Sequence, residues 1–280
     1  MTIDAHHHLW RYSAGEYEWI GDDMGALRRD FLPADFAAEL NAAGVAGSVA
    51  VQARQTLEET DALLQFARSF PFIRGVVGWA PLADFGARIG GVLDRWAGQA
   101  RLRGLRHVLQ AEPEAYFDHP GFNLALREVA ARGLSYDLLI HARQLPKAIG
   151  WADRHPGLTI ILDHLAKPPA QGAPPGEWRR RLRELAQRQN VFCKFSGLVT
   201  EVPGWNWTEA QLRPYFEVAL EAFGPGRLMF GSDWPVCLLG ASYGRWHSFV
   251  AACAAPLTGA EREGILGATC AQAYGLAGNN

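Results

Sequence analysis

The sequence has no large excess of charge of either sign. Its 280 residues include 27 basic and 29 acidic side chains, which give a formal net charge of −2. Because no long run of one sign occurs, the chain has no field that would hold nucleic acid or an anionic membrane surface. We therefore expect neither a nucleic acid nor a membrane as a partner.

Cysteines are few, and long apolar runs are missing. Cys193, Cys237, Cys253 and Cys270 form no C-x-x-C pair, which excludes the common zinc-finger and dithiol motifs and favours buried free thiols. No apolar run approaches the length of a membrane span. The first residues lack a basic region followed by an apolar stretch. We expect a cytoplasmic protein without a signal peptide.

Strand and helix patterns alternate along the whole chain. After a first strand within residues 3–10, apolar runs predict strands at 48–52, 73–80, 102–109, 134–140, 158–164, 191–195 and 228–233. Helical spacing is found at 33–41, 58–69, 84–97, 122–131, 145–154, 177–189 and 207–223, and more weakly at 251–254 and 261–273.

This alternation of strands and helices predicts a parallel sheet. Eight units in a chain of this length favour an α/β fold of the closed (β/α)₈ TIM-barrel type, with residues 1–280 as a single domain. An open doubly wound sheet is the alternative. The absence of a glycine-rich phosphate loop after the first strand weakens its nucleotide-binding version.

The stretch from Ile3 to Trp10 carries three consecutive histidines. Side chains alternate between the two faces of a strand, so we expect His6 and His8 to point the same way, joined by Asp4. Two imidazoles ~7 Å apart on one face can converge on a divalent cation. An affinity tag would be longer and would not lie within an Ile-Asp-Ala…Leu-Trp frame.

In a barrel of this type, the active site lies at the carboxyl ends of the strands. The chemically active residues at the predicted strand ends are His6, His8, Arg54, Trp79, Arg106, His107, His141, His164, Lys194 and Asp233. Five of the nine histidines are among them. Such a gathering of ionisable groups indicates catalysis more than simple binding.

Several roles are open for these residues. Asp233 directly follows an apolar strand and could either enter a site or cap a turn. His164 could bind a metal, donate to an oxyanion or cap its strand. Lys194 lies on an apolar strand and could pair with Asp233, bind a substrate oxygen or extend to the surface.

Five segments together resemble the amidohydrolase superfamily: residues 4–10, 104–107, 162–168, 194–198 and 231–235. The sequence is most similar to the amidohydrolase 2 family, in the branch of sugar lactonases such as L-fuconolactonase and L-rhamnonolactonase. The resemblance extends to Leu276. It implies that His6 and His8 bind a metal, that Asp233 accepts a proton and also serves as a ligand, and that His164 and Lys194 complete the site.

The resemblance also bears on the number of metals. Arg106-His107 stands where two-metal members carry a bridging lysine, which argues for one metal at most. Some members of this branch work without any metal, so the resemblance leaves the occupancy open.

These observations lead to a hypothesis of sugar-lactone hydrolysis, with a lactone as the small-molecule substrate. One Zn²⁺ or Mn²⁺ at His6, His8 and Asp233 would lower the pKa of a bound water, and Asp233 would take its proton. The metal, or a cation such as Lys194 or His164, would stabilise the oxyanion. The residues expected to hold the substrate are Arg54, Trp79, Arg106, His107, His141 and Trp234.

Two other functions remain as alternatives. One is non-oxidative decarboxylation or C–C hydrolysis of a small carboxylated ring compound. The other is non-catalytic binding of a ring-shaped ligand. The sequence also leaves open whether the protein is a homo-oligomer.

Overall fold

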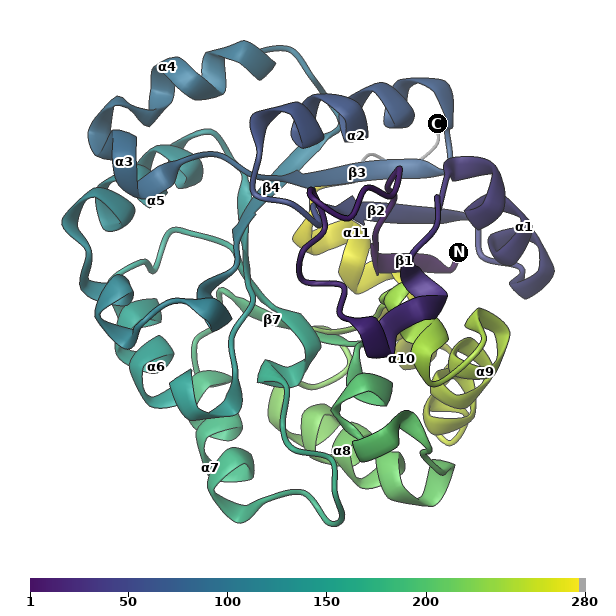
Figure 1. The fold of residues 1–280 in the computed structure, drawn as a ribbon. Helices are drawn as coiled ribbons and strands as arrows, with labels where there is room; N and C mark the ends of the chain where they lie inside the picture. The colour runs from purple at the N-terminus through teal and green to yellow at the C-terminus, as the bar shows by residue number, and fades with distance from the viewer. Residues whose placement is uncertain (277–280) are drawn as a thin grey trace.

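Eight short strands form one parallel sheet, in which each strand pairs with the next one along the chain. This computed structural model describes residues 1–276. The strands are β1 (Ile3–His7), β2 (Gly47–Val51), β3 (Ile73–Gly78), β4 (Leu102–His107), β5 (Ser135–Leu138), β6 (Ile160–Leu162), β7 (Val191–Phe195) and β8 (Leu228–Phe230). Together with the helices between them they form the predicted (β/α)₈ barrel (Figure 1).

Helices cover the outside of the sheet (Figure 1). The α-helices of residues 1–276 are α1 (Pro33–Ala43), α2 (Leu57–Ser69), α3 (Leu82–Phe85), α4 (Ile89–Leu93), α5 (Pro120–Ala131), α6 (Leu145–Asp153), α7 (Gly176–Leu185), α8 (Glu209–Phe223), α9 (Tyr243–Ala254), α10 (Gly259–Glu263) and α11 (Thr269–Ala273). None of the helices in residues 1–276 combines the length and the hydropathy that a membrane span requires.

The apolar side chains form two separate cores. The larger one lies between the sheet and the surrounding helices. The smaller one fills the barrel with alternate residues of the strands: Ile3, Ala5, Val49, Val51, Val77, Ile161, Phe192 and Met229. Cys270 and Ala273 of α11, with Tyr274 and Leu276 after it, belong to this inner core. The C-terminal helix therefore closes one end of the barrel, behind the strands in Figure 1.

Several local predictions are confirmed. The helix expected from Pro33 ends at Gly44, whose φ of +67° is the left-handed conformation typical of a helix C-terminus. The four cysteines are free and buried, as their spacing indicated.

The single helix predicted at 84–97 is wrong. The chain forms α3 and α4 instead, with short 3-10 turns at Gly86–Arg88 and Asp94–Trp96. Gly86 has φ = +51°, and a Cβ at this position would lie 3.2 Å from the Cα of Gly121 in α5. The apolar spacing of residues 84–97 correctly predicts which side chains are buried. The helix is interrupted because Gly86 has a positive φ.

The barrel is closed by contacts between residues 4–8 and residues 232–234, which we call the β1–β8 seam. The backbone N–H of Asp233 donates to the carbonyl oxygen of His6 at 2.8 Å, and that of His8 donates to Trp234 at 2.6 Å. Asp4 Oδ1 accepts from the N–H of His6 at 3.0 Å and of Ser232 at 2.8 Å. At the β1–β8 seam, the side-chain carboxylate of Asp4 thus takes the place of a backbone carbonyl as hydrogen-bond acceptor.

We expect Asp4→Ala to lower the free energy of unfolding by about 2–4 kcal/mol, because two buried N–H groups would lose their acceptor. Urea denaturation followed by tryptophan fluorescence would measure the loss. Asp4→Asn is the matched control, since it keeps one acceptor oxygen and should lose less. Equal losses in the two variants would contradict this account of the seam.

Candidate active site

A cavity of about 650 Å³ opens at the carboxyl ends of the strands. This volume is in the range of small-molecule binding sites. Most of its polar wall comes from residues that follow different strands: His8, Glu16, Arg54, Gln55, Arg106, Gln110, His164, Lys167 and Asp233. The location agrees with the expected position of a barrel active site.

An extra residue in β1 directs two histidines toward this cavity. Asp4 is opposite Ser48 and His7 is opposite Ala50, so three steps along β1 match two steps along β2. This bulge changes the alternation of side chains. Ile3 and Ala5 point into the barrel, and after the bulge so do His6 and His8, while His7 stacks on Phe36 of α1 at 4.1 Å.

The expectation that Asp4 shares the face of His6 and His8 is therefore wrong. Strict alternation would place residues 4, 6 and 8 together, but the bulge lies between Asp4 and His7. Asp4 serves the β1–β8 seam instead, through its bonds to the backbone of His6 and Ser232.

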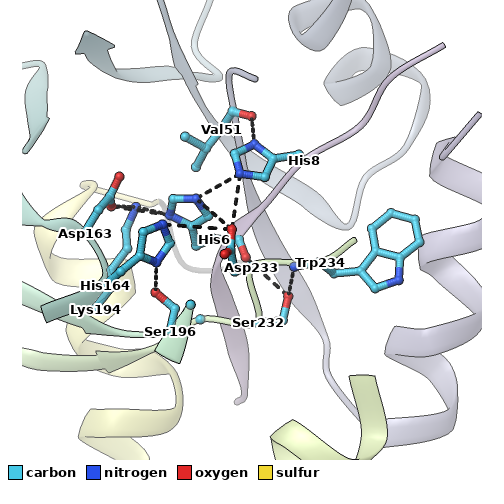
Figure 2. A network of polar contacts seen from close by, with 12 residues as sticks. His6, His8, Val51, Asp163, His164, Lys194, Ser196, Ser232, Asp233 and Trp234 are labelled. Carbon is cyan, nitrogen blue, oxygen red and sulfur yellow. Dashed lines mark hydrogen bonds and ion pairs between the residues drawn. The ribbon is translucent and has the colours of Figure 1, made fainter. Parts of the chain in front are cut away.

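Three imidazoles surround the carboxylate of Asp233 (Figure 2). The Nε2 atoms of His6 and His8 lie 3.2 Å apart. Asp233 Oδ1 lies 3.3 Å from Nε2 of His8 and 3.6 Å from Nε2 of His6. Nε2 of His164 lies 3.9 Å from the same oxygen. The structure thus brings together four residues that come from three distant parts of the chain.

The donor atoms of His6, His8 and Asp233 fit a divalent metal. They lie within 4.8 Å of one another, and all three side chains are buried. Nδ1 of His8 lies 2.7 Å from the carbonyl oxygen of Val51, which can only accept, so His8 carries its proton on Nδ1. Nε2 of a neutral His8 then offers a lone pair to the centre. This arrangement, with a carbonyl behind a histidine, is typical of metal ligands.

His164 lies on a turn with an unusual backbone. The strand predicted at 158–164 ends at Leu162, and the residues from His164 to Lys167 all have φ between 48° and 60°. Left-handed conformations at residues other than glycine cost energy and gather at functional sites. This turn carries both His164 and Lys167 to the cavity wall.

The surroundings of His164 and Asp233 shift the pKa of each side chain. Burial lowers the pKa of His164 to about 4, so its imidazole is neutral near pH 7. Burial by itself would raise the pKa of Asp233, but the neighbouring His164 holds it below its usual range. The centre therefore contains an ionised carboxylate beside the neutral imidazole of His164.

A second group of charges lies inside the barrel, beneath His6. Lys194 Nζ is 2.5 Å from Asp137 Oδ2, 2.9 Å from Asp163 Oδ1 and 3.0 Å from Nδ1 of His6. Asp163 Oδ2 accepts from Arg106 at 2.9 Å. Burial would lower the pKa of Lys194, but the two carboxylates raise it above its ordinary value. Two cations and two anions thus neutralise one another.

This arrangement corrects the expectation for Lys194. Its ammonium group pairs with Asp137 and Asp163, not with Asp233, and it is fully buried. Within residues 1–276, Lys194 is not among the side chains that line the cavity. A buried ammonium group needs partners of opposite charge. The apolar strand that carries Lys194 contains no such partner, so the sequence did not indicate the ion pairs.

Of the six residues expected to hold the substrate, Arg54 and Arg106 line the cavity. The other four lie outside the wall that residues 1–276 form: Trp79, His107, His141 and Trp234. Trp79 Nε1 donates to His107 Nδ1 at 3.2 Å, and His107 Nε2 is 2.9 Å from Glu112. Trp234 stacks on Phe36 at 4.8 Å, in the outer core.

Three residues around the centre were not expected from the sequence: Asp163, Asp137 and Ser196. Asp163 and Asp137 are fully buried beneath His6, and Ser196 Oγ lies 2.8 Å from Nδ1 of His164. One signal was present for the two acids: each lies within an apolar run, where a carboxylate requires a partner. Ser196 gave no comparable signal.

The fold and the site together define a (β/α)₈-barrel enzyme whose centre is built from histidine and carboxylate side chains. Comparisons with known proteins assign the family. Residues 3–276 match the amidohydrolase family, which is nearly the whole chain. The protein belongs to this family.

Individual relatives are similar over almost their full length. The chain is 40% identical to an L-fucono-1,5-lactonase of Burkholderia multivorans, over 99% of this chain and 96% of the relative. It is 36% identical to an L-fucono-1,5-lactonase of Burkholderia ambifaria, over 90% and 87% of the two chains. A crystal structure of a B. multivorans amidohydrolase with bound zinc superposes with a TM-score of 0.95, at 40% identity, over 99% of this chain and 100% of the other.

We expect Gly197→Ala to lower the free energy of unfolding by about 2–4 kcal/mol. Gly197 has φ = +69°, and an added Cβ would lie 2.6 Å from Nδ1 of His164. Thermal and urea unfolding would measure the loss. Gly204→Ala is the control, because Gly204 has φ = +64° but nothing within 4 Å of an added Cβ. A similar loss in both variants would show that contact with His164 adds nothing to the backbone cost.

Proposed function

We propose that the protein hydrolyses a sugar lactone, an aldonolactone such as L-fucono- or L-rhamnonolactone, to the open sugar acid. The observation that carries the proposal is the position of Asp233 Oδ1 within 3.3–3.9 Å of three imidazole Nε2 atoms at a cavity wall. The 40% identity to an L-fucono-1,5-lactonase supports the substrate class. Hydrolysis of a ring ester requires a water-activating base and a group that stabilises an oxyanion.

His6, His8 and Asp233 are the residues that would hold one divalent cation, and we propose zinc, with Mn²⁺ as the alternative. Two imidazole nitrogens and a carboxylate oxygen form a donor set that suits zinc. When bound, the cation supplies positive charge that lowers the pKa of water and polarises a carbonyl oxygen. The relative of known structure with bound zinc supports this choice of metal.

Asp233 is the proposed proton acceptor. Its carboxylate is held ionised by the neighbouring His164, and it lies on the cavity wall. A water between Asp233 and the lactone carbonyl would lose its proton to the carboxylate as it attacks the carbonyl carbon. The proton then passes to the ring oxygen, which leaves as the hydroxyl of the sugar acid.

His164 is the proposed oxyanion donor. In this arrangement Ser196 Oγ donates to Nδ1 of His164, and Nε2 carries the proton that faces the centre. A neutral imidazole can donate to the oxyanion without losing a proton. Lys194 has no such role in the proposal, because Asp137 and Asp163 hold it beneath His6.

Arg54 and Arg106 are the proposed contacts to the ring and its hydroxyls. Arg54 lies between Glu16, at 2.5 Å, and Glu59, at 3.0 Å, so its fork is fixed at the cavity mouth. Carboxylate and guanidinium groups side by side offer both acceptors and donors to a polyol. Glu16 and Arg54 both line the cavity.

We expect a pH-indicator assay to show acid release from one or two members of a panel of five- and six-membered sugar lactones. Prolonged dialysis against a chelator should abolish the activity, and added zinc or Mn²⁺ should restore it, if the proposed cation is required. Elemental analysis of the dialysed protein provides the control for complete removal. Full activity in metal-free protein would reject the metal, and CO₂ release without lactone hydrolysis would reject lactonase chemistry.

We expect Asp233→Asn to lower kcat by at least about 100-fold, because an amide cannot take the proton from water. The amide retains an oxygen, so fold and metal content should stay close to those of the wild type. Circular dichroism and elemental analysis would check both. Glu16→Gln at the cavity mouth should change mainly KM, and wild-type turnover in Asp233→Asn would eliminate the proposed base.

A further inference from the structure

Nδ1 of His6 faces two groups with opposite requirements (Figure 2). Lys194 Nζ lies 3.0 Å away, and an ammonium group can only donate. Asp163 Oδ1 lies 3.3 Å away, and an ionised carboxylate can only accept. A neutral imidazole carries a single N–H, so Nδ1 can satisfy one of these partners but not both.

The choice at Nδ1 decides the state of Nε2 on the other side of the ring. If Nδ1 accepts from Lys194, the proton resides on Nε2, which then donates to Nε2 of His8 at 3.2 Å. His8 can accept this bond, because its own proton is on Nδ1 and points to Val51. In this tautomer His6 offers no lone pair to a cation.

The other tautomer has the opposite consequence. If Nδ1 donates to Asp163, then Nε2 of His6 carries a lone pair beside those of His8 and Asp233 Oδ1. Nη1 of Arg106 lies 3.3 Å from this Nε2, but it also donates to Asp163 Oδ2 at 2.9 Å and can keep that bond when a cation takes the lone pair. A carboxylate behind a histidine in this way orients the ring and strengthens it as a ligand. Lys194 can keep its bonds to Asp137 and Asp163 while it gives up its contact with Nδ1.

We propose that Lys194 and Asp163 compete for Nδ1 of His6 and thereby set the affinity of the centre for a divalent cation. Lys194 stabilises the tautomer that closes the site, and Asp163 stabilises the tautomer that opens it. Both are positioning residues that act through His6. This inference rests on the proposed metal at His6, His8 and Asp233.

The surroundings favour such a role over simple packing. Lys194, Asp137, Asp163 and His6 are all fully buried, in the interior that other strands fill with apolar side chains. Buried ion pairs of this kind add little stability compared with apolar residues of similar size. Tyr274 also donates to Asp137 at 2.6 Å, so the C-terminal segment helps to hold Lys194 in place.

The test is the zinc affinity of metal-free protein, measured by competition with a chromophoric chelator. We expect Lys194→Met to bind zinc about 10-fold more tightly than the wild type, and Asp163→Asn about 10-fold or more weakly. In Asp163→Asn the amide oxygen can face either Arg106, which donates to Oδ2 in the wild type, or Lys194, which lies 2.9 Å from Oδ1. In either orientation the variant lacks the carboxylate that stabilises a proton on Nδ1 of His6, because a neutral amide is the weaker acceptor.

The opposite directions separate competition from damage to the fold. Structural damage would weaken zinc binding in both variants, and weaker or unchanged binding in Lys194→Met would overturn the proposal. Lys194→Met leaves Asp137 without its cation. The double variant Lys194→Met with Asp137→Asn restores neutrality and should keep the tighter binding. Lys147→Met, which removes an ion pair with Asp118 on the surface, is the control and should leave the affinity unchanged.

Two further measurements complete the test. In metal-free wild type, ¹⁵N-histidine NMR should show the proton of His6 on Nε2, and in Lys194→Met on Nδ1; a proton on Nδ1 in both would overturn the proposal. His8→Ala tests the proposed site itself. Zinc binding that persists in His8→Ala would place the metal elsewhere and reject the site, whereas equal affinities of the wild type and Lys194→Met would reject only the competition.

Discussion

The extra residue in β1 is the constraint on which the rest of the centre depends. Without this bulge, either the apolar pair Ile3 and Ala5 or the histidine pair would face the barrel interior, but not both. With it, the lower part of β1 fills the core and the upper part faces the cavity. At the β1–β8 seam, the carboxylate of Asp4 accepts hydrogen bonds from the N–H groups of His6 and Ser232.

Beneath the centre, charged side chains fill the barrel interior in place of apolar ones. The inner core of Val49, Val77, Ile161 and similar residues gives way to Lys194, Arg106, Asp137 and Asp163 on the side toward His6. Each of these charges has an opposite partner within 2.9 Å, which is the condition under which burial of charge is tolerated. These charges also orient the ring of His6, because a cation and an anion both contact its Nδ1.

Much of the site could be predicted because the barrel has a simple geometry. Parallel strands bring all their carboxyl ends to one edge, so the residues after strands 1, 6 and 8 had to meet. This is why His6, His8, His164 and Asp233 were found from the sequence. The aromatic residues Trp79 and Trp234 also follow strands, but they contact His107 and Phe36 and are not part of the cavity wall that residues 1–276 form.

The amino-acid sequence by itself determined the alternation of strands and helices, the barrel, and the edge where the chemistry lies, because these follow from hydrophobic periodicity and chain length. Only the tertiary structure decided which charged residues pair, since Lys194, Asp137 and Asp163 come from three strands and their spacing in the chain carries no information about distance. It also decided the direction of Asp4 and the left-handed turn at His164, because a bulge and a turn depend on the neighbouring strands and not on local composition.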